Sequence, residues 1–269
     1  MRRLLPAIAL LIVLSGFLGI QKVTPTTKNS SYTTGEVLEY RVHLAFFTVG
    51  KASTRVDKNL HKINNKTCYK VDAYGKTADW IGWVSKFDDN WGAYIDTTSL
   101  LAQISYRKLQ EGSYRRDETV TFDHEKNKAE VKVKNNETGK DEIKVYDVPN
   151  NTKDLVAGFL HLRIVDFKKL NPKDTIVISG FLEDKAYNLK IIYVGKETIS
   201  TKVGKIPCIK LRPVMPANSL FDGEDSIFCW ISDDQNKIPI KLQAKMFIGS
   251  AGLELSSFRG LRNQLKMAF

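Results

Sequence analysis

Apolar and polar residues alternate with a period of two along most of this chain. Segment 38–46 places its apolar residues on one face and Glu39, Arg41 and His43 on the other. Segments 119–123, 131–134 and 189–194 show related alternation. This period is typical of β-strands, whose successive side chains point to opposite faces of a sheet. Turn-forming residues mark the breaks between strands, at 64–65, 111–113, 135–139 and 233–236.

Two stretches about 140 residues apart repeat one another in outline. The first comprises 66–71, 94–96 and 100–104, and the second comprises 206–211, 230–232 and 238–242. An internal echo of antiparallel strand units predicts one large sheet built from two similar halves, over 35–148 and 173–260.

One segment departs from the alternation and predicts a helix over residues 152–169. Asn151 or Thr152 is the expected N-cap, Asp154 lies in the first turn, and Asn171-Pro172 ends the helix. Its apolar residues spread around most of the circumference, which requires burial on several sides. We therefore predict an all-β, mainly antiparallel fold over residues 35–264. In it, a large curved sheet or open barrel of two similar halves wraps around one buried central helix.

The first 20 residues resemble a secretory signal peptide. Arg2 and Arg3 precede an apolar run of about 17 residues that ends in small residues. An uncleaved membrane anchor is the alternative. No cysteine lies near this run, so we expect an exported protein that is not a lipoprotein; its place in a Gram-negative periplasm or envelope is implied only by the family resemblance given below. The polar residues 21–34 are expected to form a flexible leader.

Basic residues exceed acidic ones, which gives a formal net charge of +11. Without Arg2 and Arg3 the chain still carries 39 basic against 30 acidic residues. Such an excess favours anionic partners, including a membrane surface. The alternative is that scattered lysines only solvate exposed strand faces. We expect no nucleic-acid partner, because no recognition module is visible.

Few residues suggest covalent or metal chemistry. Cys208 and Cys229 would face each other in a hairpin centred near residue 219, so a disulfide between them is one hypothesis and buried free thiols are the other. Asp222, Glu224 and Asp225 form an oxygen-rich loop that is a weak candidate for calcium, although such residues also suit tight turns. We expect no cofactor, and no catalytic motif is present.

Aromatic residues are the main indication of a ligand. A curved sheet around one helix can leave a cavity, and cavities for apolar ligands are lined by aromatic and aliphatic side chains. Filling of the core by the same rings is the alternative reading. The candidates for such a lining are Phe46, Trp80, Trp83, Trp91, Tyr94, Phe159 and Trp230.

The motifs Gly-Glu-x-Leu-x-Tyr at 35–40 and Phe-x-x-Gly-x-Ala at 47–52 carry a family resemblance. From about residue 35 to 262 the chain resembles the exported domain-of-unknown-function family numbered 3108. The resemblance implies an envelope protein of Gram-negative, Bacteroidetes-type bacteria, without a known activity or ligand. The expected shape is similar to the half-barrels that carry lipoproteins across the periplasm.

Three functions remain open from the sequence. The first is a non-catalytic exported protein that binds an apolar or amphipathic ligand such as lipid or glycolipid. The second is an envelope assembly or scaffolding factor, which predicts a filled interior and an exposed apolar patch or sheet edge. The third is a glycan hydrolase, which predicts two carboxylates facing one another in a cleft.

Overall fold

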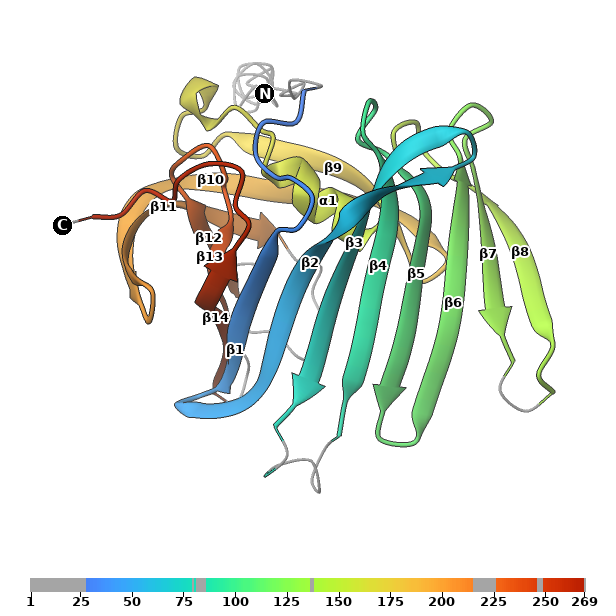
Figure 1. Ribbon diagram of the computed structural model, residues 1–269, viewed down its shortest axis with the longest axis horizontal. Helices are drawn as coiled ribbons and strands as arrows, with labels where there is room; N and C mark the ends of the chain where they lie inside the picture. Colours follow the sequence, from blue (N-terminus) through green and yellow to red (C-terminus); the bar gives the residue numbers. More distant parts are fainter. Residues whose placement is uncertain are drawn as a thin grey trace, which may run out of the picture.

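The fold is that of a computed structural model, in which the described residues form one antiparallel sheet (Figure 1). The structure describes residues 28–78, 80, 86–135, 138–214, 226–245 and 249–268. Within them the strand order is β8-β7-β6-β5-β4-β3-β2-β1-β14-β13-β12-β11-β10-β9. Each strand therefore pairs with its neighbours in sequence, except that β8 and β9 do not pair and that β1 pairs with β14.

The first half of the chain supplies eight strands: β1 (Val37–Leu44), β2 (Phe47–Ile63), β3 (Lys66–Thr77), β4 (Asp88–Asp96), β5 (Ala102–Glu111), β6 (Tyr114–Asp123), β7 (Lys128–Lys134) and β8 (Asp141–Asp147). Helix α1 (Leu155–Leu162) and the 3-10 helix η2 (Phe167–Lys169) follow. The second half supplies six strands: β9 (Thr175–Leu182), β10 (Lys185–Thr201), β11 (Gly204–Val214), β12 (Ile227–Ser232), β13 (Pro239–Lys245) and β14 (Ser250–Arg259).

The two halves are built alike. β1 and β9 each have 8 residues, and β2 and β10 each have 17. Cys68 of β3 pairs with Asp96 of β4, and at the corresponding place Cys208 of β11 pairs with Ser232 of β12. The internal echo in the sequence thus corresponds to two meanders of six strands, β1–β6 and β9–β14.

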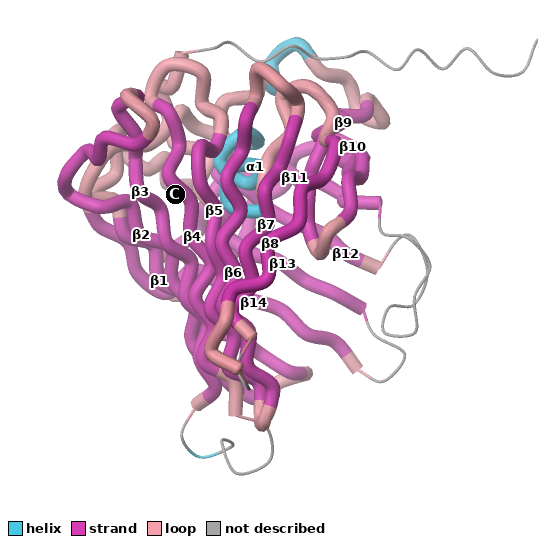
Figure 2. Tube along the Cα trace, turned by 90° about the vertical axis from the view of Figure 1, so that its right-hand side faces the viewer, coloured by secondary structure: helices cyan, strands magenta, loops and turns pink. Residues whose placement is uncertain are grey.

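The sheet curls around α1 without a hydrogen-bonded closure between β8 and β9, the two ends of the strand order. Figure 2 shows α1 between the two sides of the curled sheet, and the helix contacts β3, β4 and β9. The predicted fold class is confirmed: a curved antiparallel sheet of two similar halves encloses one helix.

The helix is shorter than the predicted 152–169. Backbone atoms of Lys153 bond to β9, since its N–H donates to Ser179 and its carbonyl accepts from Phe181. A residue bound into a sheet in this way cannot begin a helix, so the next residue, Asp154, is the N-cap in place of Asn151 or Thr152, and α1 starts at Leu155. It ends before Arg163, and the remaining apolar residues continue as turns and η2.

Residues just before β1 are packed, so the prediction of a flexible leader over 21–34 is wrong for its last part. Tyr32 is 1% exposed and packs edge-on against Tyr69, with ring centroids 5.5 Å apart. The Ser31 hydroxyl donates to the carbonyl of Arg163 at 2.6 Å. The predicted signal peptide and residues 21–27 lie outside the described residues. Neither described helix has the length and apolarity needed to cross a bilayer.

A buried ion pair joins this leader segment to the end of α1. The Arg163 guanidinium donates to both oxygens of Glu36, at 2.6 and 2.9 Å, and both side chains are almost fully buried. The same guanidinium donates to the carbonyls of Ser31 and Asn236. Arg163 therefore connects the chain before β1, the end of α1 and the β12–β13 turn.

Arg163→Met should destabilise the protein by about 3–5 kcal/mol, because it leaves the Glu36 carboxylate buried without its partner. Adding Glu36→Leu should restore part of this loss. Urea unfolding measures both effects, with exposed Lys144→Met expected to stay within about 0.5 kcal/mol of the parent. A loss below about 1 kcal/mol for Arg163→Met would contradict the role given to this pair.

Of the two hypotheses for Cys208 and Cys229, the disulfide is wrong and the buried free thiols are found. Cys208 pairs with Ser232 and Cys229 pairs with Leu211, so the two cysteines are offset by three positions and point to opposite faces of the sheet. All three cysteines are buried free thiols. Burial raises the pKa of Cys68 to about 11 and those of Cys208 and Cys229 to about 12.

A thiol reagent should therefore label three cysteines per chain after denaturation without reductant, and react slowly with the native protein. Mass spectrometry of the labelled protein measures this directly. Finding only one reactive thiol in the denatured, unreduced chain would mean that a disulfide exists after all.

Candidate functional site

A cavity of about 330 Å³ lies beside α1, within the curl of the sheet. Leu155, Val156, Phe159 and Leu160 of the helix line it, and Val156, Ala157 and Leu160 are also buried in the core. Leu155 is 47% exposed, although it is a large apolar residue at the start of a central helix. The apolar circumference of α1 therefore serves burial on one side and a cavity wall on the other.

Strands from both halves of the chain form the rest of the wall. Inward-facing positions of β1 to β4 meet those of β12 to β14 across the cavity, and most of these side chains are apolar. The strand residues with such side chains are Tyr40, Ala52, Val56, Val71, Ala73, Trp91, Cys229, Pro239, Leu242 and Leu253. The cavity thus lies where the two halves of the sheet, joined by the pairing of β1 with β14, face one another.

Polar groups lie at both ends of the helix that borders this cavity. At the C-terminal end, the Glu36–Arg163 pair contributes to the wall with its hydrogen bonds already formed. At the N-terminal end, Trp91, Leu155 and Val156 border both the cavity and a second polar cluster. The space between the two ends is apolar.

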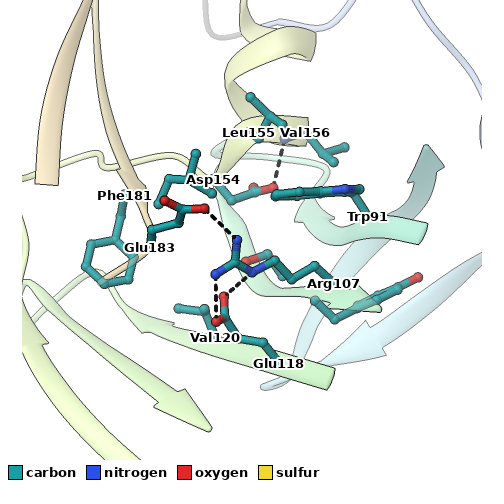
Figure 3. Close-up of a pocket in the computed structure, with 12 residues that line it drawn as sticks. Trp91, Arg107, Glu118, Val120, Asp154, Leu155, Val156, Phe181 and Glu183 are labelled. Carbon is teal, nitrogen blue, oxygen red and sulfur yellow. Dashed lines mark hydrogen bonds and ion pairs between the residues drawn. The ribbon is translucent and has the colours of Figure 1, made fainter. Parts of the chain in front are cut away.

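The second cluster is centred on Arg107 of β5 (Figure 3). Its guanidinium pairs with Glu118 of β6 at 2.8 and 2.9 Å and approaches Glu183 at 3.5 Å. Arg107 also lies over the ring of Trp91, 5.3 Å from the centroid. Arg116 adds a further contact to Glu118. Both oxygens of Glu118 are therefore engaged by arginines.

Asp154 caps α1 next to this cluster. Its carboxylate accepts the backbone N–H groups of Val156 and Ala157, at 2.9 and 3.2 Å. The side chain is buried, and desolvation raises its pKa to about 6 in spite of these hydrogen bonds. Two turns later on the helix, burial lowers the pKa of His161 to about 4.

The space between Asp154, Glu118 and Glu183 is small, with a volume of about 20 Å³. Such a volume holds about one water molecule. A glycan hydrolase places a sugar ring between its two carboxylates, and inverting enzymes add a water. The arrangement therefore suits a structural polar cluster better than a hydrolytic centre.

Two of the residues proposed as a lining, Trp91 and Phe159, do border the cavity. Trp91 shares the inward face of β4 with Ala93, and Phe159 lies on the free flank of α1. The sequence analysis missed the aliphatic part of the wall. Alternation on β3, β13 and β14 could have indicated it, since Val71, Leu242 and Leu253 lie on inward positions.

The other described candidates point elsewhere, so their assignment to the cavity wall is wrong. Phe46 lies in the β1–β2 turn and is 83% exposed, and Trp80 is 57% exposed. Tyr94 and Trp230 each lie next to inward-facing residues on their strand, so their own side chains face outward. Tyr94 meets His61 and Tyr106, whereas Trp230 donates to Glu197 at 2.6 Å.

The remaining candidates fall outside the described residues: Trp83 and the possible calcium ligands Asp222, Glu224 and Asp225. Within the described part of the chain, no group of three or more His, Cys, Asp or Glu side chains is arranged to hold a metal ion.

The sequence matches a family model over residues 39–256, which is most of the chain. That family is described as "protein of unknown function (DUF3108)". The chain belongs to the DUF3108 family. This confirms the resemblance seen in the sequence motifs, and the family description assigns no activity. No curated protein matches the chain.

The DUF3108 chain is similar in fold to a solved β-barrel-like DUF1849 protein from Brucella abortus, with a TM-score of 0.54 and 8% identity. That match covers 85% of this chain and 98% of the other. A candidate lipoprotein from Parabacteroides distasonis is 10% identical with a TM-score of 0.36, over 88% of this chain and all of the other. A candidate exported protein with a YmcC-like fold from Bacteroides fragilis shows the same identity and coverage with a TM-score of 0.34.

The raised pKa of Asp154 makes a prediction about stability and pH. The carboxyl of Asp154 binds a proton more tightly in the folded state than in the unfolded state. Protonation of Asp154 therefore adds to the free energy of unfolding below about pH 4, and this addition is lost as the pH rises through about 6. Asp154→Asn keeps an N-cap but removes the titration. Lowering the pH from 7.5 to 4 should therefore raise the unfolding free energy of the parent, relative to that of the variant, by roughly 2 kcal/mol. Urea unfolding of both proteins at each pH tests this, and a constant difference would contradict it.

Proposed function

We propose that this DUF3108 protein is a non-catalytic, exported binding protein whose cavity beside α1 holds the apolar part of a lipid or glycolipid. The observation that carries the proposal is the cavity itself. Its 330 Å³ lies at the lower end of the range for small-molecule sites, and its wall is mostly aliphatic and aromatic. Each methylene buried there would contribute about 0.8 kcal/mol.

Export is supported by the first 20 residues, where two arginines precede an apolar run and small residues. A periplasmic or envelope protein meets lipids and glycolipids, so the location and the cavity agree. The neutral, apolar middle of the cavity suits acyl chains, whereas its polar ends already satisfy their own hydrogen bonds.

A scaffolding role is the second candidate, and the free edge of β8 is the observation that favours it. Ile143 and Val145 are exposed large apolar residues on that strand, which among the described strands pairs with β7 alone. An open edge of this kind can accept a strand from another chain. The cavity beside α1 favours the ligand-binding proposal, because a protein that acts only as a scaffold needs no cavity.

Filling the cavity tests the proposed function. Ala73 of β3 borders the cavity beside Trp91, so Ala73→Leu should weaken binding of a fluorescent fatty-acid probe, and Ala73→Trp should weaken it further. Displacing about two methylenes corresponds to roughly tenfold weaker binding. Lipid extraction and mass spectrometry of the parent, purified from its own host, should recover a bound lipid that Ala73→Trp lacks.

Lys132→Trp, which adds the same ring on an exposed position of β7, is the matched control and should bind the probe like the parent. Circular dichroism and thermal unfolding establish that each variant is folded. Equal probe affinity in the parent, a folded Ala73→Leu and a folded Ala73→Trp would exclude this cavity as the binding site.

A further inference from the structure

Three basic residues lie directly beside one another on the outer face of the sheet. Arg41 of β1 pairs with Lys51 of β2, and Lys51 pairs with Lys76 of β3. Side chains in such cross-strand positions have Cβ atoms about 4.5–5.5 Å apart, and like charges there are destabilising. We refer to Arg41, Lys51 and Lys76 as the cationic row.

Only the two ends of the cationic row are neutralised within the described part of the chain. Glu254 pairs with Arg41 at 3.1 Å and Asp88 lies 3.8 Å from Lys76. Lys51, between two cations, has no carboxylate partner among the described residues. The buried Nε of Arg41 also has no hydrogen-bond partner there. Arg41 Nε is enclosed, so Lys51, which is exposed, is the member of the row that offers donors and positive charge the fold leaves unused.

The cationic row borders a groove of about 440 Å³. Arg55 and Lys202 add two further cations, and Lys202 comes from the β10–β11 turn of the other half of the chain. Glu39 is the one acidic side chain of this lining, and it accepts a hydrogen bond from Ser257 at 2.6 Å. The groove is therefore strongly positive and of a size that can hold a phosphate-bearing group.

The turn that connects β1 to β2, the strands that carry Arg41 and Lys51, is apolar and exposed. Phe46 and Phe47, with ring centroids 4.3 Å apart, are 83% and 55% exposed in the β1–β2 connection. Leu44 beside them is also exposed. Leu44 lies three positions after Arg41, which corresponds to roughly 10 Å along a strand. Peripheral membrane segments bury apolar residues about 5–10 Å below the headgroups, so the two features match one bilayer surface.

We propose that the outer face of β1–β3 binds an anionic lipid surface, with lipid phosphates in the groove of the cationic row and the Phe46–Phe47 turn in the acyl boundary. The side chains of the cationic row point to the opposite face of the sheet from the cavity beside α1, and the groove and the cavity share Tyr40, Ala52, Ser53 and Tyr74 as lining residues. Different variants test the two proposals, so either can fail without the other.

Co-sedimentation with vesicles tests the membrane site. The parent should bind vesicles that contain phosphatidylglycerol and should not bind vesicles of phosphatidylcholine alone. Lys51→Gln removes the unpaired cation in the middle of the row and should weaken binding about tenfold, the loss of one charge-assisted hydrogen bond. Phe46→Ser should weaken binding by a similar factor through lost apolar burial.

Lys190→Gln is the matched control, since it removes one exposed lysine from β10 and changes the net charge equally. It should bind anionic vesicles like the parent. Lys51→Gln should also unfold at a higher temperature than the parent at low salt without vesicles, because it relieves repulsion within the row. This second readout establishes that weaker vesicle binding does not come from unfolding.

Three results would overturn the proposal. The first is a parent protein that does not bind anionic vesicles. The second is an equal loss of binding in Lys51→Gln and Lys190→Gln, which would indicate net charge rather than a site. The third is stabilisation by inorganic pyrophosphate without vesicle binding, which would assign the groove to a soluble phosphate compound instead.

Discussion

The placement of α1 inside the sheet depends on the buried ion pair between Glu36 and Arg163. Burial of two charges is unfavourable unless each is paired and hydrogen-bonded, and here the guanidinium bonds both carboxylate oxygens and two backbone carbonyls. These partners come from segments far apart in the sequence. Because no solvent can replace them at this depth, the end of α1, the chain before β1 and the β12–β13 turn adopt one relative position.

The opposite end of α1 is fixed by different chemistry. Lys153 bonds to β9 through its backbone, and Asp154 caps the first turn of the helix. A helix held at both ends can leave one flank unpacked without moving into the space beside it. The cavity next to Leu155 and Phe159 follows from this rigidity, since a loosely held apolar helix would collapse onto the sheet and bury that surface.

Much of the fold could be predicted from local patterns, because they are repeated. The echo places Thr97 and Asp233 at equivalent positions, and the structure gives them equivalent backbone bonds, to Thr67 at 2.9 Å and to Pro207 at 2.8 Å. The site was harder to predict. Trp91 and Tyr94 are both candidates for the cavity lining from sequence alone, yet three positions along a strand put them on opposite faces. The Glu36–Arg163 pair spans 127 residues, and no local pattern indicates such a contact.

The alternation that builds the sheet also places apolar residues on its inner face and basic residues on its outer face. On β1 to β3, inward positions such as Tyr40, Val71 and Ala73 border the cavity, while the residues between them include the cationic row. A slip of one residue in the pairing of β2 would bring Lys51 inward and Ala52 outward. The burial of charge that this requires makes the slipped register very unfavourable. The basic residues therefore help to specify the register that creates the apolar cavity, whatever each face binds.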